Sequence, residues 1–137
     1  MHIRNVTLAD LPAVREIDRR SFDADDQYSD VQYSRAVTSA SYDALAAIDE
    51  RGDVIAWALI DRASLPVRIR SLAVHPDCRR RGVGARLVFE TVERFGTPID
   101  LLVDPANTGA IAFYEKLGFI FEGADPQVPQ RLRMVRA

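Results

Sequence analysis

The sequence predicts an α/β fold in which a mixed sheet is covered by helices. Two observations carry this prediction: the spacing of apolar residues changes between a period of two and a period of three to four, and the resulting elements follow the order β-α-α-β-β-β-α-β-α-β-β. At 137 residues the chain is long enough for one buried core and too short for two ordinary domains. We therefore expect residues 1–137 to form a single domain.

The composition is typical of a globular protein. Hydrophobic residues make up 47% of the chain and charged residues 28%, the formal net charge is -2, and the pI is about 5.7. This balance gives no support for a nucleic-acid-binding surface, and the longest fully apolar run, residues 54–60, is shorter than the roughly 20 residues that span a bilayer. Neither a nucleic acid nor a membrane is an expected partner. The single cysteine, Cys78, cannot form an internal disulfide, and residues 1–10 lack the apolar core of a signal peptide, so a reducing cytoplasm is the expected compartment.

The first predicted elements are a strand over residues 2–6 and a helix. Thr7 and Asp10 form a capping pair that opens this helix, which is expected to end near Phe22. Its apolar stripe is expected to contain Leu8, Leu11, Val14 and Ile17. Its water-facing side is expected to contain Arg15, Glu16, Asp18 and Arg19.

A second, weaker helix follows the acidic loop of residues 23–30. Ser29 and Gln32 can cap this helix, which is expected to reach about Ala40.

The apolar period then changes to two. Residues 42–49 and 53–61 flank Gly52, and this pattern predicts an antiparallel hairpin. Residues 66–76 form a third long strand that is stopped by Pro76.

A helical period returns after Gly84, and the helix it predicts is closed by Gly96. The apolar residues of this helix are Ala85, Val88, Val92 and Phe95. Asn107 is placed to cap one further helix. The remaining elements are a buried strand at 99–103, that last helix at 108–117, and two final strands at 119–123 and 131–137.

The stretch CRRRGVGARL, residues 78–87, places three arginines and two glycines where a strand turns into a helix. The first N–H groups of a helix have no partner within it, and the helix dipole favours negative charge there. Gly82 and Gly84 remove side chains that would keep a phosphate from the backbone, and the arginines add positive charge. The alternative is a solvated basic turn whose glycines are chosen only for their backbone conformation.

The stretch LAVHPDCRRRGVGARL resembles the acetyl-coenzyme A motif of the GNAT N-acetyltransferase superfamily. That motif reads Arg or Gln, two residues, Gly, one residue, then Gly or Ala, and Arg79, Gly82 and Gly84 fill these places. NTGAIAFYEKLGF resembles the later helix of the superfamily, and the element order matches from end to end. The resemblance implies a mostly antiparallel sheet with helices on both faces, and an acyltransferase that uses acetyl-CoA.

The resemblance also implies which residues bind the cofactor. The pyrophosphate would lie on the backbone amides of residues 79–85, and the pantetheine arm would pair with residues 71–74 as an added strand does. No metal site is predicted. The implied cofactor-binding residues are Leu72, Ala73, Val74, Arg79, Arg80, Arg81, Gly82, Val83, Gly84, Ala85, Asn107 and Tyr114.

Two of these residues carry an implied catalytic role. The N–H of Leu72 would stabilise the thioester oxyanion, and Tyr114 would protonate or hydrogen-bond the departing thiolate. Leu72 and Val74 can also be plain core residues, because the catalytic role concerns the backbone. Tyr114 can equally be a core tyrosine, and for Asn107 a helix cap is favoured over a contact with the pantetheine arm.

The sequence departs from the family at the general base. Arg68 and Leu102 occupy the two places where relatives carry a glutamate, and an arginine cannot act as a base at pH 7. Asp100 and Asp104 lie on one face by strand alternation, so either can act through water or be a charge at the strand end. Without a strong base an α-amino group is favoured, since neutralising it at pH 7 costs only about 1.4 kcal/mol against roughly 4 to 5 kcal/mol for an alkyl ammonium.

The acceptor is expected to be a primary amine of a small molecule or a peptide, and it would bind near the first two helices. The acids there can attract a cationic amine or form an ordinary solvated loop. Arg68 can receive a carboxylate of the acceptor. The predicted acceptor-side residues are Arg68, Asp23, Asp25, Asp26, Tyr28 and Asp30.

Two other functions remain open at this point. One is a non-catalytic acyl-CoA-binding or sensor module that keeps the phosphate-binding turn of residues 79–85 and lacks the general base. The other is an interaction protein that forms a homodimer through an exposed hairpin edge.

Overall fold

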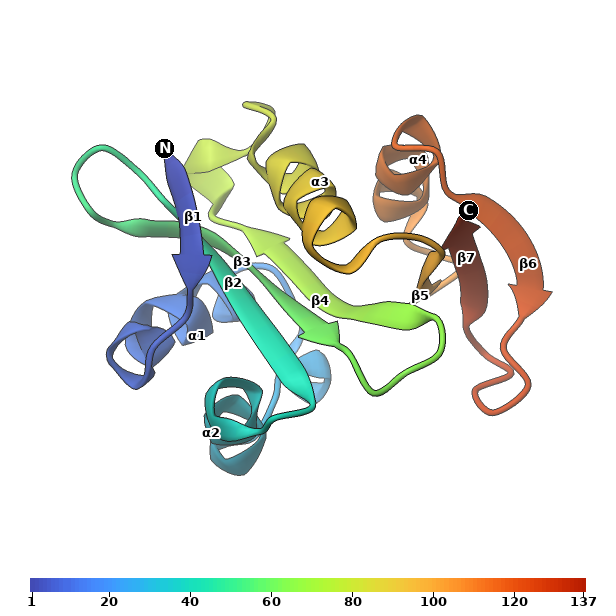
Figure 1. The fold of residues 1–137 in the computed structure, drawn as a ribbon, viewed down its shortest axis with the longest axis horizontal. Helices are drawn as coiled ribbons and strands as arrows, with labels where there is room; N and C mark the ends of the chain where they lie inside the picture. The colour runs from blue at the N-terminus through green and yellow to red at the C-terminus, as the bar shows by residue number, and fades with distance from the viewer.

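The computed structural model describes residues 1–137, apart from the side chain of Asp25, so this one predicted acceptor-side acid lies outside the described side chains. The predicted order of elements is confirmed (Figure 1). The strands are β1 (His2–Asn5), β2 (Tyr42–Ile48), β3 (Val54–Asp61), β4 (Val67–Val74), β5 (Ile99–Val103), β6 (Ile120–Ala124) and β7 (Leu132–Arg136). The helices are α1 (Leu11–Arg19), α2 (Asp30–Thr38), α3 (Val83–Phe95) and α4 (Thr108–Lys116), with short 3-10 turns at Leu8–Asp10, Ala24–Asp26 and Pro76–Cys78.

One seven-stranded sheet in the order β1-β2-β3-β4-β5-β7-β6 forms the centre of the molecule. Neighbouring strands are antiparallel except β4 and β5, which run parallel. This parallel pair is joined at Val67↔Ile99, Arg68↔Asp100 and Ile69↔Leu101, and no pairing is recorded beyond them in the described chain. The later halves of β4 and β5 therefore leave an edge of each strand without a neighbour.

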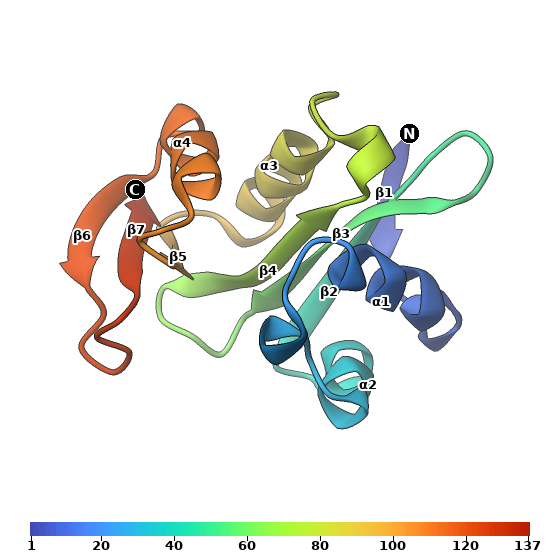
Figure 2. The same cartoon turned by 180° about the vertical axis from the view of Figure 1, so that it is seen from behind.

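Helices cover the two faces of the sheet unequally. Helices α3 and α4 lie on one face, and α1 and α2 lie on the other (Figures 1 and 2). Figure 2 shows α1 and α2 over the half of the sheet that begins with β1, so β5, β6 and β7 have no helix on that face. The buried core accordingly divides into a cluster under α3 and α4, which includes Leu87 and Tyr114, and a cluster under α1 and α2, which includes Ile17 and Trp57.

Local signals in the sequence account for the ends of most elements. Thr7 with Asp10 and Ser29 with Gln32 form capping boxes, as predicted. Gly52 has φ +87° in the β2–β3 turn, and the Asn107 side chain accepts a hydrogen bond from the Ala110 N–H at 3.1 Å. The favoured reading of Asn107 as a cap is therefore confirmed.

Two predictions for the first helix are wrong. Leu8 is 57% exposed, because it lies in the 3-10 turn before α1 and so departs from the helical stripe. Asp18 does not face water but is only 1% exposed. Its two carboxylate oxygens accept hydrogen bonds from the Tyr33 hydroxyl at 2.6 Å and the Trp57 Nε1–H at 2.8 Å, and these bonds offset part of the cost of burying the group.

Within the described residues, no helix is both long and apolar enough to cross a membrane.

Candidate active site

The turn between β4 and α3 presents a run of free backbone donors. In the described structure, none of the N–H groups of residues 79–85 donates to another protein group. The helical bonds begin with the Arg86 N–H, which donates to the Gly82 carbonyl at 3.0 Å. Such a run at a helix N-terminus is suited to an anion.

Left-handed backbone conformations shape this turn. Arg80 has φ +64° and Gly82, the N-cap of α3, has φ +77°. A left-handed residue next to a right-handed one turns successive N–H groups toward one concave side, a geometry that suits anions, and Gly82 stands in this relation to the helical residues that follow it. Gly82 suits this position because only glycine adopts such a φ without cost.

Gly84 has a different structural reason. A Cβ at Gly84 would lie 3.2 Å from Cζ of Phe113 and 3.5 Å from Cγ2 of Val74, whereas a Cβ at Gly82 would meet nothing within 4 Å. Gly84 thus allows the start of α3 to pack closely against α4 and β4. This contact is independent of the predicted role of Gly84 in admitting a phosphate.

The three arginines of the turn do not act alike. The Arg79 guanidinium points back toward the strand, donating from Nε to the Val74 carbonyl and from Nη2 to the Ser21 hydroxyl, each at 3.2 Å. Arg80 and Arg81 are exposed, and no ion pair of theirs is found among the described side chains. Arg79 therefore connects β4 to the end of α1, while the other two guanidinium groups face solvent.

The strand β4 offers its backbone to the space that β5 leaves. The His75 N–H donates to the Ile55 carbonyl of β3 at 2.8 Å, so by strand alternation Ala73 also directs its N–H and C=O toward β3. Leu72 and Val74 direct theirs to the opposite side, where β5 no longer pairs. An extended ligand can bind this edge as an added strand does.

A cleft of about 560 Å³ opens at this position. It is lined by six of the predicted site residues: Leu72, Asn107 and Tyr114 from the cofactor side, and Asp23, Asp26 and Tyr28 from the acceptor side. Its remaining lining residues include Phe22, Arg70, Leu102, Asp104 and Arg131.

Tyr114 reaches the cleft from the buried face of α4. Its side chain packs edge-on against Phe113 and Phe119, with ring centroids 5.0 and 5.5 Å apart. Burial raises the pKa of the Tyr114 phenol above its usual value. Its hydroxyl has no hydrogen-bond partner among the described residues, so the donor is free for a ligand.

The residues at the expected base position form an ion-pair network. Arg68 Nε and Nη2 donate to the two oxygens of Asp100 at 2.9 and 3.0 Å, and Arg133 Nε donates to the same carboxylate at 2.8 Å. Asp100 is 1% exposed, and neither it nor Arg68 lines the cleft. Asp104 does line the cleft, and one of its oxygens accepts the Ala106 N–H at 2.9 Å.

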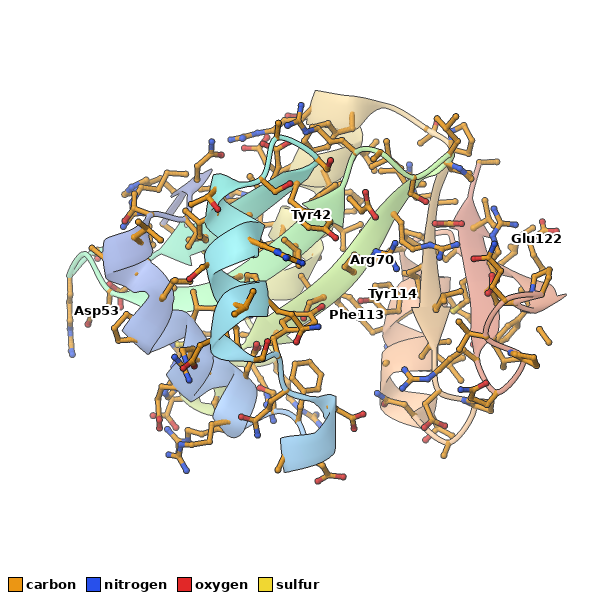
Figure 3. All side chains as sticks on the ribbon, turned by 90° about the horizontal axis from the view of Figure 1, so that it is seen from below. Tyr42, Asp53, Arg70, Phe113, Tyr114 and Glu122 are labelled. Atoms are coloured by element: carbon orange, nitrogen blue, oxygen red, sulfur yellow. The ribbon has the colours of Figure 1, made fainter. Side chains whose placement is uncertain are left out.

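Arg70 is a cleft residue that the sequence analysis missed. Its Nε and Nη2 donate to one oxygen of Asp61 at 3.0 and 2.7 Å. Figure 3 shows Arg70 and Tyr114 in the space between β4 and β5. The available signal was the alternation of Val67, Arg68, Ile69 and Arg70, which marks a polar strand face without indicating which arginine reaches the cleft.

A model of the acetyltransferase (GNAT) family matches residues 11–119 of the chain. Over 69 residues the chain is 33% identical to mycothiol acetyltransferase from Saccharopolyspora erythraea, an alignment that covers 48% of this chain and 23% of that protein. The fold is similar to that of ribosomal-protein-S18-alanine N-acetyltransferase from Escherichia coli, with a TM-score of 0.79, 22% identity, and coverage of 98% of this chain and 92% of that one. It is also similar to the PaiA N-acetyltransferase from Thermoplasma acidophilum in complex with coenzyme A, with a TM-score of 0.78, 18% identity, and coverage of 98% and 97%.

The chain spans 23–36% of the lengths of the curated relatives it matches. The likenesses to the two solved structures concern the fold.

Proposed function

Because the chain belongs to the acetyltransferase (GNAT) family, we propose that residues 1–137 form one domain that transfers an acetyl group from acetyl-CoA to a primary amine of a small molecule or peptide. The nitrogen of the neutral amine bonds to the thioester carbon, the carbon–sulfur bond breaks, and the nitrogen gives up one proton to solvent. The sulfur leaves as the thiolate of coenzyme A, which takes up a proton from solvent. The observation that carries this proposal is the free N–H run of residues 79–85 beside the open edge of β4.

The N–H run serves as the binding site of the pyrophosphate. Two negatively charged groups in sequence match a concave row of backbone donors at the N-terminus of α3. The exposed Arg80 and Arg81 add charge at the rim. The Arg79 side chain supports the end of β4 instead, so the contribution of Arg79 to binding comes from its N–H.

The open edge of β4 holds the pantetheine arm and the thioester. Leu72 and Val74 present backbone groups toward the cleft, although the Val74 carbonyl already accepts from Arg79. The Leu72 N–H is the donor for the oxyanion that forms when the amine attacks. Preorganised backbone donors of this kind supply a large part of catalysis in acyl transfer.

Tyr114 acts on the leaving sulfur as a hydrogen-bond donor. Burial raises its pKa, so the phenol stays protonated at neutral pH. A phenol of raised pKa is a poor full proton donor to a thiolate, whose conjugate acid has a pKa near 8.5. A hydrogen bond to the developing thiolate stabilises the transition state without complete transfer.

Among the described side chains, the cleft contains no strong base for the acceptor amine. Asp100 is bound by Arg68 and Arg133. The carboxylates that do line the cleft are Asp23, Asp26 and Asp104, and their role is to orient a water or the amine. The acceptor therefore reacts from its small neutral fraction, and amines of lower pKa are favoured. Asp26 and Tyr28 line the acceptor side of the cleft.

The proposal is tested by following thiol release from acetyl-CoA with a panel of amines, beside calorimetry with coenzyme A. Binding together with acetylated product supports it. Binding without product from any amine favours the non-catalytic module. Such a module would also be consistent with Arg68, which stands where relatives carry the base and is paired to Asp100. Absence of coenzyme A binding contradicts both.

A further inference from the structure

We propose that Arg70 selects the acceptor by donating a hydrogen bond to an oxygen on the carbon next to the amine-bearing carbon, so that the substrate class is α-amino carbonyl compounds: amino acids, their amides or peptide N-termini. The inference rests on the proposed acetyl transfer. It makes Arg70 a specificity-determining residue and gives it the acceptor-binding role that the sequence suggested for Arg68.

A β-bulge places Ser71 on the same face of β4 as Arg70. Leu59 pairs with Ser71 and Ile60 pairs with Ile69, so Arg70 is the extra residue of β4. Ile69 and Leu72 pack in the cluster under α3 and α4. The bulge therefore leaves Arg70 and Ser71 together on the opposite face, where both line the cleft.

The position of Arg70 suits contact with the acceptor. Arg70 lies two residues before Leu72, whose N–H is the proposed oxyanion donor. The Tyr28 hydroxyl, on the acceptor side, approaches the Arg70 carbonyl at 3.4 Å. An amine placed to attack a carbonyl beside Leu72 has its own substituents near this part of β4.

Asp61 holds the guanidinium in one orientation. One oxygen of Asp61 accepts from both Nε and Nη2 of Arg70, and the other accepts from the N–H groups of Ala63 and Ser64 at 3.0 and 3.2 Å. The Asp61 side chain is 8% exposed and that of Arg70 is 41% exposed. The remaining nitrogen, Nη1, makes no hydrogen bond or ion pair with the described residues, so its N–H groups are free.

The ion pair determines what kind of group Arg70 can recognise. Asp61 neutralises the arginine, so the contact depends on directed N–H groups more than on net charge. A fixed planar donor matches a carbonyl or carboxylate oxygen. Such an oxygen next to the amine-bearing carbon also lowers the amine pKa, and this agrees with the lack of a strong base.

Two amines of similar basicity provide the test: glycinamide, which has the carbonyl oxygen, and propargylamine, which lacks it. In Arg70→Met we expect KM for glycinamide to rise at least about tenfold and KM for propargylamine to change less than about twofold, with similar kcat. Arg70→Lys keeps the charge but lacks the planar N–H donors of the guanidinium, so it should lose most of the preference for glycinamide over propargylamine. The control is Arg62→Met, since Arg62 is 44% exposed and paired to Asp43 but does not line the cleft.

Equal effects of Arg70→Met on both amines, or no effect on either, would overturn the inference while leaving acetyl transfer intact. If wild-type protein binds coenzyme A but acetylates neither these amines nor a peptide, the proposed function and the inference fail together. Loss of Arg70 leaves Asp61 buried without its partner, and the double variant Asp61→Asn, Arg70→Met removes both charges. The same two-amine comparison in the double variant gives the answer if the single variant does not fold.

Discussion

Gly84 and Phe113 lie so close that a Cβ on Gly84 would be 3.2 Å from Cζ of Phe113. The glycine of the cofactor turn is thereby also a packing residue between α3 and α4. A substitution at Gly84 therefore affects the packing of α3 on α4 and the candidate cofactor site at the same time.

The first prediction tests the packing role of Gly84 by comparing Gly84→Ala with Gly109→Ala. Each glycine is the second residue of its helix, but a Cβ at Gly109 meets nothing within 4 Å. Gly84→Ala should destabilise the protein by about 1–3 kcal/mol through overpacking, and Gly109→Ala should be neutral or stabilising by up to about 1 kcal/mol. Denaturant unfolding measures both, and equal stabilities would contradict the packing role of Gly84.

The second prediction concerns Tyr114→Phe. The change removes one oxygen that bonds to nothing in the described protein, so the melting temperature and coenzyme A affinity should hardly change. The kcat should fall at least about tenfold, because the hydrogen bond to the leaving sulfur forms in the transition state. Wild-type turnover in the variant would identify Tyr114 as a core tyrosine only.

The third prediction is a pH profile set by the substrate. Since the described side chains of the cleft include no strong base, kcat/KM should rise about tenfold per pH unit until the acceptor amine is neutral, and α-amino compounds should lead at pH 7. The raised pKa of Tyr114 keeps its phenol protonated through this range. A plateau already reached at pH 6 with an alkyl amine would reveal an efficient base that this account lacks.

The fourth prediction concerns the buried carboxyl of Asp18. Burial raises its pKa despite the bonds from Tyr33 and Trp57. A raised folded-state pKa means that its contribution to stability is present below the unfolded pKa, near 4, and is lost as pH rises through the folded value. Between about pH 4 and pH 7 the free energy of unfolding of wild type should therefore fall relative to that of Asp18→Asn. A constant difference over that range would show that burial does not shift this group.

Local signals made most of the fold predictable, and distant contacts account for what was missed. The capping pairs at Thr7 and Ser29 are complete within four residues of sequence. The partners of Asp18, by contrast, come from α2 and β3, and helical periodicity alone placed it on the water side. Alternation placed Arg68 and Arg70 on one face of β4, but partners on other strands decide which of the two reaches the cleft: Asp100 of β5 holds Arg68, and Asp61 of β3 holds Arg70.

The same distinction applies to the candidate site. The turn of residues 79–85 is local in sequence, so the stretch of arginines and glycines indicated this candidate site directly. The binding of Asp100 by Arg68 and Arg133 joins three strands, and alternation along one strand could only show that Asp100 and Asp104 share a face.

The central claim is that the N–H groups of residues 79–85 bind the pyrophosphate of coenzyme A, and Ala85→Pro tests it most directly. Proline removes one N–H in the first turn of α3, where that group has no partner in the described protein and proline is tolerated. Val31→Pro is the control: it places a proline at the second residue of α2, in that helix's first turn, where the side chain is 60% exposed and outside the cleft. Calorimetry should show coenzyme A binding roughly ten- to a hundredfold weaker in folded Ala85→Pro, as expected for a lost hydrogen bond to a charged group, and unchanged in Val31→Pro. Unchanged coenzyme A affinity in folded Ala85→Pro would contradict pyrophosphate binding by these N–H groups.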